Sequence, residues 1–190
     1  MEDKFFYWGP LLYKAIVKNY KLMLNHHNKD VSNNHNLAGI LNNQFVFDKT
    51  FFKDQVSDIF KRYLDFYEPY YNIPLKNKEY DITGCWINFM KQGDFNPPHI
   101  HQNGDFSCVL YLDIPEKLKE ENQAYLGTDK AGPGGIQFIY GEDRPYTISN
   151  IHFFPQAGDF FIFPANLRHV VYPFKSNCIR ISMSANFKLI

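Results

Sequence analysis

A chain of 190 residues can bury a core as a single domain without disulfide or metal staples, which excludes a small cross-linked scaffold. Lysine plus arginine and aspartate plus glutamate each number 20, so the formal net charge is zero and general attraction to nucleic acid or to anionic membranes is not expected. Aromatic residues make up 18% of the chain, which favours a core of sheets over a helical bundle.

The N-terminal residues and the cysteines indicate a reducing compartment. The opening MEDKFFYWGP contains acidic residues and is followed by no sustained apolar stretch, so neither a signal peptide nor a membrane span is expected. Cys85, Cys108 and Cys178 are odd in number and widely spaced, which suits free thiols better than a disulfide framework. We therefore expect a cytoplasmic protein without a membrane or nucleic-acid partner.

Residues 1–80 are expected to be a helical front within a single domain of residues 1–190. Apolar residues at near-helical spacing predict a first helix over residues 10–24. A second helix is predicted from Asp48 to Pro69, where proline ends the pattern. The apolar stripe of the second helix comprises Phe52, Val56, Ile59, Phe60, Tyr63 and Tyr67.

Residues 81–190 are expected to form a sandwich or a closed sheet. Seven short β-rich runs follow one another without a long helix between them, which argues against alternating strands and helices. The charged, glycine-rich stretch over residues 115–135 predicts a loop between two of these runs. The runs are DITGCWINFM, FSCVLYLDI, GGIQFIYG, NIHFF, DFFIFP, HVVYPF and CIRISMSANF.

Two histidines in the stretch FNPPHIH are candidate metal ligands. In an extended chain, residues i and i+2 project from the same face, so His99 and His101 would converge on one point. His169, which opens a later β-rich run, is a third candidate ligand. The alternative is that these imidazoles lie in polar turns and form hydrogen bonds with the backbone.

Arg180 is a candidate for binding an anion. It lies in the apolar run NCIRISMSANF, and Ser182 shares its face of the predicted strand. A buried arginine requires an anionic partner, and its guanidinium binds a carboxylate through two parallel hydrogen bonds. An internal pair with an aspartate or an exposed edge strand would also explain it. Asn88, polar within CWINFM, and Tyr111 are further candidates for lining such a site.

Four stretches carry a resemblance to a known superfamily. The chain resembles the 2-oxoglutarate/Fe(II)-dependent oxygenases, and more closely small phage and bacterial members, over nearly its whole length. The stretches are CWINFMKQGDFNPPHIH, FSCVLYLDIP, GDFFIFPANLRHVVYPF and RISMSANF, in that order.

The resemblance implies an α+β, mainly β fold: a double-stranded β-helix, a jelly-roll-like barrel, with N-terminal helices packed on one side. It also implies that His99 and His169 bind Fe(II), and that Arg180, with Ser182, binds the far carboxylate of 2-oxoglutarate. The implied activity is hydroxylation of a small-molecule or peptide substrate, with release of succinate and CO2. A homodimer is compatible with the helical front.

The third metal ligand departs from the superfamily pattern. Most members place an acidic residue two positions after the proximal histidine, where this chain has His101. Asp105 is the alternative ligand, but Gly104 interrupts a regular strand between the two residues. The choice between His101 and Asp105 stays open at this point.

Two other readings stay open as well. A three-histidine, cupin-like dioxygenase without 2-oxoglutarate would use His99, His101 and His169 but would leave Arg180 without a ligand. A non-catalytic β-barrel that binds a partner or a small molecule is the other alternative, because one fold hosts many functions. Zinc-dependent hydrolysis is disfavoured because no glutamate near the histidine pair is suited to act as a general base.

Overall fold

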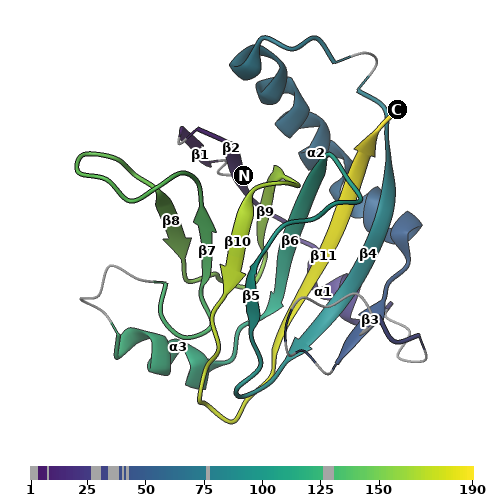
Figure 1. Cartoon of the computed structure of the whole chain (residues 1–190). Coiled ribbons are helices and arrows are strands. Elements are labelled where there is room, and N and C mark those ends of the chain that lie inside the picture. Colours follow the sequence, from purple (N-terminus) through teal and green to yellow (C-terminus); the bar gives the residue numbers. More distant parts are fainter. Residues whose placement is uncertain are drawn as a thin grey trace.

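Two antiparallel sheets form a barrel in the computed structural model, which describes residues 4–7, 9–26, 31–33, 39, 41, 43–75, 78–125 and 131–190 (Figure 1). The strands of the larger sheet are β1 (Lys4–Tyr7), β2 (Leu11–Ile16), β3 (Gln44–Val46), β4 (Tyr80–Met90), β6 (Phe106–Asp113), β9 (Asp159–Pro164) and β11 (Arg180–Leu189). Those of the smaller sheet are β5 (Asn96–His99), β7 (Ile136–Ile139), β8 (Asn150–Phe153) and β10 (Arg168–Val171).

The order of the strands is that of a jelly roll. The larger sheet runs β1-β2-β9-β6-β11-β4-β3 and the smaller sheet runs β5-β10-β7-β8, so the chain crosses repeatedly from one sheet to the other. This arrangement is the double-stranded β-helix, and the expected α+β, mainly β fold class is confirmed. All seven predicted β-rich runs contain a strand.

Strand β11 lies between β4 and β6 and gives the larger sheet two different faces. Ser184 pairs with Trp86 of β4 on one side and with Val109 of β6 on the other. Because side chains alternate along a strand, Met183, Ala185 and Phe187 join one hydrophobic core on the outer face. The intervening side chains, which line a cavity between the two sheets, are those of Arg180, Ser182, Ser184 and Asn186.

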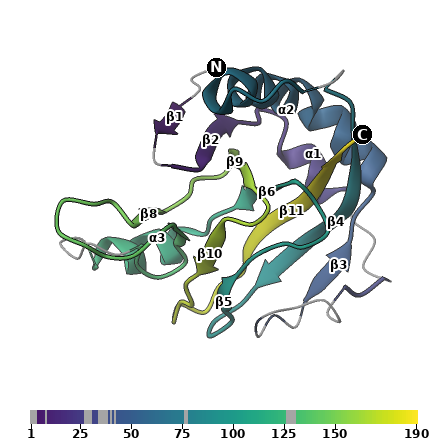
Figure 2. The same ribbon diagram turned by 45° about the horizontal axis from the view of Figure 1, so that its top comes forward.

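Helix α2 (Lys49–Tyr71) covers the outer face of the larger sheet, as Figures 1 and 2 show. The Asp48 carboxylate caps it by accepting hydrogen bonds from the backbone N–H groups of Thr50 and Phe51. The helix continues two residues beyond its predicted end at Pro69, because proline in the last turn removes only one hydrogen bond. The helix ends at Asn72, whose backbone adopts the left-handed conformation with φ of 53°.

The predicted helix over residues 10–24 is wrong over most of its length. Residues 11–16 form strand β2, and only α1 (Lys21–Leu24) is helical. Leu11, Tyr13, Ala15 and Val17 all pack into the core beneath α2, which is the period of two that a strand requires. Pairing of β2 with β1 and β9 therefore overrides the weaker helical spacing.

The predicted loop over residues 115–135 contains an additional helix, α3 (Glu116–Gln123). The side chain of Glu121 accepts hydrogen bonds from the backbone N–H groups of Lys175 and Ser176, so α3 holds the turn before β11. Residues 126–130 of the predicted loop lie outside the described residues. Across the described ranges, no helix is both long and apolar enough to cross a membrane.

We expect replacement of Phe60 by alanine to lower the free energy of unfolding by about 3 to 5 kcal/mol, because it leaves a cavity in the core. Phe60 is fully buried, and its ring stacks on that of Phe187 with centroids 4.0 Å apart. Lys61→Ala, on the exposed side of the same turn, is the control and should change the value by less than about 0.5 kcal/mol. Urea denaturation measures both values, and equal losses would contradict the assigned core.

Candidate active site

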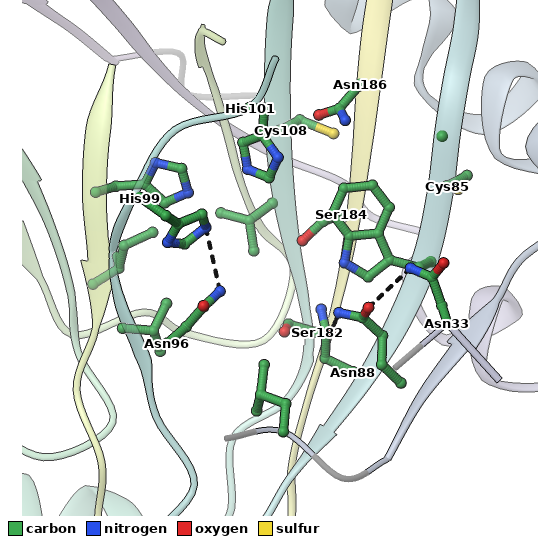
Figure 3. Close-up of a pocket in the computed structure, with 18 of the residues that line it drawn as sticks. Asn33, Cys85, Asn88, Asn96, His99, His101, Cys108, Ser182, Ser184 and Asn186 are labelled. Carbon is green, nitrogen blue, oxygen red and sulfur yellow. Dashed lines mark hydrogen bonds between the residues drawn. The ribbon is translucent and has the colours of Figure 1, made fainter. Parts of the chain in front are cut away.

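Strands β5 and β10 bring the three predicted histidines together. His99 pairs with His169 across the two strands, and their ring centroids lie 4.2 Å apart. His101 lies just beyond β5, where its backbone N–H donates to the Ala165 carbonyl at 2.8 Å. One ring nitrogen from each histidine lies within 4.8 Å of the others. Figure 3 shows His99 and His101 side by side at the wall of the cavity.

Backbone carbonyls orient two of these imidazoles. His99 Nδ1 lies 2.7 Å from the Pro97 carbonyl, and His169 Nδ1 lies 3.0 Å from the Leu167 carbonyl. A carbonyl oxygen only accepts, so each Nδ1 carries the proton and each Nε2 keeps its lone pair. This is the tautomer that a metal-binding histidine requires when Nε2 is the ligand atom.

Burial keeps all three imidazoles neutral. It lowers the pKa of His99, although the hydrogen bond to the Pro97 carbonyl opposes that shift. It lowers the pKa of His101 to about 4, with a smaller contribution from neighbouring His99. It also holds the pKa of His169 well below its usual value. Neutral imidazoles are the form that binds metal, so the cluster needs no proton release near neutral pH.

Asp105 does not lie with the histidines. Its carboxylate accepts hydrogen bonds from Lys188 Nζ at 2.9 Å and from the backbone N–H of Leu189 at 2.8 Å. Burial, and to a smaller extent the Asp105 charge, raises the pKa of Tyr67 on α2, which is on the outer side of the larger sheet. In the described part of the chain, the group of potential metal ligands consists of His99, His101 and His169.

Arg180 is buried, with 3% of its surface exposed, in the interior of the larger sheet. Its Nη1 donates to the Gly134 carbonyl at 2.8 Å, and its guanidinium carbon lies 5.3 Å from the centroid of the Tyr111 ring. No carboxylate pairs with it among the described residues, and its Nε has no hydrogen-bond partner there. Within the residues that the structure describes, Arg180 therefore has no internal pair with an aspartate, and β11 is not an edge strand.

Tyr111 contributes a second buried polar atom to the same place. Its hydroxyl has no hydrogen-bond partner within the described residues, and burial raises its pKa to about 12. The positive charge of Arg180 lowers the pKa of Tyr111, but by less than burial raises it. A guanidinium and a phenol that both keep donors available form a site for an anion, because buried donors are almost always paired.

One cavity of about 550 Å³ unites these groups. The histidine cluster, Arg180 and Tyr111 all line it, as do Ser182 on β11 and Asn88 on β4. The Oδ1 atom of Asn88 accepts from Gln44 Nε2 at 2.5 Å, which fixes this side chain beside β3. Of the candidate site residues, only Asp105 lies outside the cavity lining.

Several polar residues that line the cavity were not predicted from the sequence. Asn96 approaches His99 Nε2 through its Nδ2 at 3.3 Å, and its buried Oδ1 has no partner in the described part of the chain (Figure 3). Ser184 and Asn186 continue the row of Arg180 and Ser182. The alternation in RISMSAN was a usable signal for that row, whereas nothing local distinguishes Asn96.

Comparison with protein families identifies the chain. A family model described as "Putative 2OG-Fe(II) oxygenase" matches residues 84–186, which is more than half of the sequence. The chain belongs to this family. The matched segment contains the three histidines, Arg180 and Tyr111. No curated protein matches the sequence.

Solved structures of 2OG-Fe(II) oxygenases share the fold. The viral collagen prolyl hydroxylase of Paramecium bursaria Chlorella virus-1 is 13% identical, with 94% of this chain and 96% of that chain covered and a TM-score of 0.56. The α-ketoglutarate-dependent epimerase SnoN from nogalamycin biosynthesis is 12% identical, with 93% and 76% covered and a TM-score of 0.53. A prolyl hydroxylase from Trichoplax adhaerens is 13% identical, with 91% and 76% covered and a TM-score of 0.50.

The family is one of oxidoreductases that use Fe(II) and 2-oxoglutarate, so the expected enzyme class and cofactors are confirmed. The chain's own residues fit both groups. Three neutral imidazoles suit a divalent transition metal, and one ring nitrogen from each lies within 4.8 Å of the others. The unpaired Arg180 Nε and Tyr111 hydroxyl suit a carboxylate.

We expect the metal-free oxygenase to lose stability as the pH falls below about 6.5, the usual pKa of an unfolded histidine. The lowered pKa values in the folded state mean that the unfolded chain binds more protons between about pH 6.5 and 4. Each extra proton contributes a slope of about 1.4 kcal/mol per pH unit. Urea denaturation over this pH range should show a shallower slope for His101→Asn, and identical slopes would contradict a buried neutral His101.

Proposed function

We propose that this oxygenase is a hydroxylase that inserts one atom of O2 into a C–H bond of its substrate. The other oxygen atom enters 2-oxoglutarate, which leaves as succinate and CO2. Iron supplies the oxidising chemistry when bound, and the protein supplies ligands, cosubstrate orientation and exclusion of water. The observation that carries the proposal is the buried, unpaired Arg180 in the same cavity as the three-histidine cluster.

In this proposal, His99, His101 and His169 hold the iron. His99 and His169 are positioned by strand pairing and by backbone carbonyls, and His101 takes the place that an acidic residue has in most of the superfamily. Three neutral ligands leave the Fe(II) centre one unit more positive than two histidines and a carboxylate do. That extra positive charge should strengthen the hold on the dianionic cosubstrate.

Arg180 would bind the far carboxylate of 2-oxoglutarate. Within the described cavity lining, its Nε and the Tyr111 hydroxyl are buried donors without a partner, and Ser182 lies on the same face of β11. Asn88 projects from β4, which pairs with β11 at Ser182. Its carboxamide is already oriented by Gln44, so we assign it a contact with the cosubstrate.

The unpaired guanidinium also weighs against the two other readings. A three-histidine dioxygenase without 2-oxoglutarate would leave Arg180 buried with no anion, which costs several kcal/mol. A non-catalytic barrel would have no need for a cluster of neutral imidazoles beside it. Both groups have a use in a 2-oxoglutarate-dependent hydroxylase.

We expect Arg180→Ala to weaken 2-oxoglutarate binding to the Mn(II)-loaded protein by about 2 to 5 kcal/mol, because a buried charge pair loses one partner. Arg180→Lys should also weaken it, since an ammonium cannot form the two parallel hydrogen bonds. Isothermal titration calorimetry measures both affinities. The matched controls are Arg168→Ala and Arg168→Lys on the exposed side of β10, which should leave the affinity unchanged. Equal affinity in all variants would remove Arg180 from the site.

We expect His101→Ala to lose bound iron and succinate formation, whereas Asp105→Asn keeps both. His101 projects into the cavity with the other imidazoles, and Asp105 is bound to Lys188 and Leu189. Elemental analysis and succinate assays on the two purified variants give the comparison. If Asp105→Asn loses the metal and His101→Ala retains it, the third ligand is Asp105 and the centre is an ordinary two-histidine, one-carboxylate triad.

A further inference from the structure

The cavity carries little charge beyond the group assigned to 2-oxoglutarate. Among the described residues that line it, Arg180 is the single arginine, and no lysine, aspartate or glutamate is present. One wall is supplied by four uncharged residues, Asn33, Leu41, Gln44 and Val46. A charged substrate would therefore lose hydration here without gaining a partner of opposite charge.

Neutral hydrogen-bonding groups are abundant in the same cavity. Ser184 and Asn186 lie farther along β11 than Arg180, on the same face, and both line the cavity (Figure 3). Within the described residues, the Ser184 hydroxyl forms no hydrogen bond, and the Asn186 amide accepts one from Ser107 Oγ at 3.0 Å. The Asn186 amide nitrogen therefore stays available to donate, beside a hydroxyl that can donate or accept.

The rim of the cavity also carries neutral hydrogen-bonding side chains. Gln102 and Asn103 are exposed on the segment after β5 and line the opening. The Thr83 hydroxyl donates to the Asn103 carbonyl at 2.5 Å, which holds that segment against β4. The rim therefore offers two neutral carboxamides, each of which both donates and accepts hydrogen bonds.

Trp86 adds a flat apolar surface next to the histidine cluster. Its ring is half-buried, lines the cavity and lies with its centroid 5.8 Å from that of His101. The half-buried ring presents a face to the C–H groups of a ligand.

The neighbouring sheet edges are closed to an extended peptide. Pro97 and Pro98 remove two backbone donors from β5, the edge strand of the smaller sheet. At β3, the edge of the larger sheet, Ser32 already bridges to Phe45, and the Val46 N–H donates to the Val31 carbonyl. A peptide could not add as a strand at either edge, so recognition must come from side chains within the cavity.

We propose that the substrate is a compact, uncharged, polyhydroxylated molecule of the sugar or polyol class. Its hydroxyl groups bind the serine and carboxamide side chains named above, and its C–H face packs on Trp86. Packing there brings a C–H bond to the side of the cavity that His101 lines. The inference rests on the proposed function, because the reacting bond must face the metal.

The experiment uses the protein loaded with Mn(II) and 2-oxoglutarate, and a panel of matched probes. Glucose, xylose and maltose are the neutral members, glucuronate and glucosamine are the charged ones, and a dipeptide blocked at both ends represents peptides. Paramagnetic broadening of probe protons in NMR spectra measures binding next to the metal. We expect Mn(II) to broaden the proton signals of at least one neutral sugar. The acidic and amino relatives of that sugar should bind at least tenfold more weakly.

A pair of variants tests the cavity wall. Asn186→Asp introduces a charge without a change of size and should weaken binding of the neutral sugar at least several-fold. Asn150→Asp, on β8 and outside the cavity lining, should leave that binding unchanged.

Equal or tighter binding of glucuronate or glucosamine, or broadening of the dipeptide alone, would overturn the inference. The inference would also be overturned if the protein binds 2-oxoglutarate by calorimetry but broadens the proton signals of none of the sugars. Failure to bind 2-oxoglutarate at all would instead count against the proposed function.

Discussion

The pairing of β11 with both β4 and β6 is the constraint on which the rest of the molecule depends. A strand in the middle of a sheet must place alternate side chains on opposite faces, and β11 uses the two faces for different purposes. Met183, Ala185 and Phe187 meet the aromatic core under α2, while the residues between them are polar and line the cavity. A slip of one residue would exchange the faces, so the aromatic core fixes the position of the functional row.

The cavity face of β11 lowers the stability of the protein when no ligand is bound. Arg180 is withdrawn from water with one hydrogen bond from Nη1 and a contact with the Tyr111 ring, while its Nε has no partner within the described residues. An unpaired buried donor costs about 1 to 3 kcal/mol. Binding of a carboxylate would remove that cost, so the same atoms that lower the stability of the free protein would raise its affinity for cosubstrate.

Many strands of the barrel, and the gathering of the histidines and Arg180 at one cavity, could be predicted because they follow from local alternation. The row in RISMSAN, the spacing in HIH and the seven β-rich runs each express the period of two of an extended chain. The prediction failed at residues 10–24, where pairing with β9, far away in sequence, outweighed a local helical spacing. It could not choose between His101 and Asp105 because the direction of the chain at Gly104 depends on β11, to which Asp105 is bound. Asn96 and Gln44 were missed because their places in the cavity depend on the pairing of β5 with β10 and of β3 with β4.

The pairing of β11 is also required before the cavity can contain both the three histidines and Arg180. Arg180 pairs with Met90 and Leu189 pairs with Tyr80, so the strand joins segments that are distant in the sequence. Such contacts must overcome a large loop-closure entropy before they stabilise the fold. Without β11, the chain has all three histidines but neither Arg180 nor the strand that separates the aromatic core from the cavity. Pairing of β11 with β4 and β6 is therefore what adds a buried guanidinium to a set of potential metal ligands.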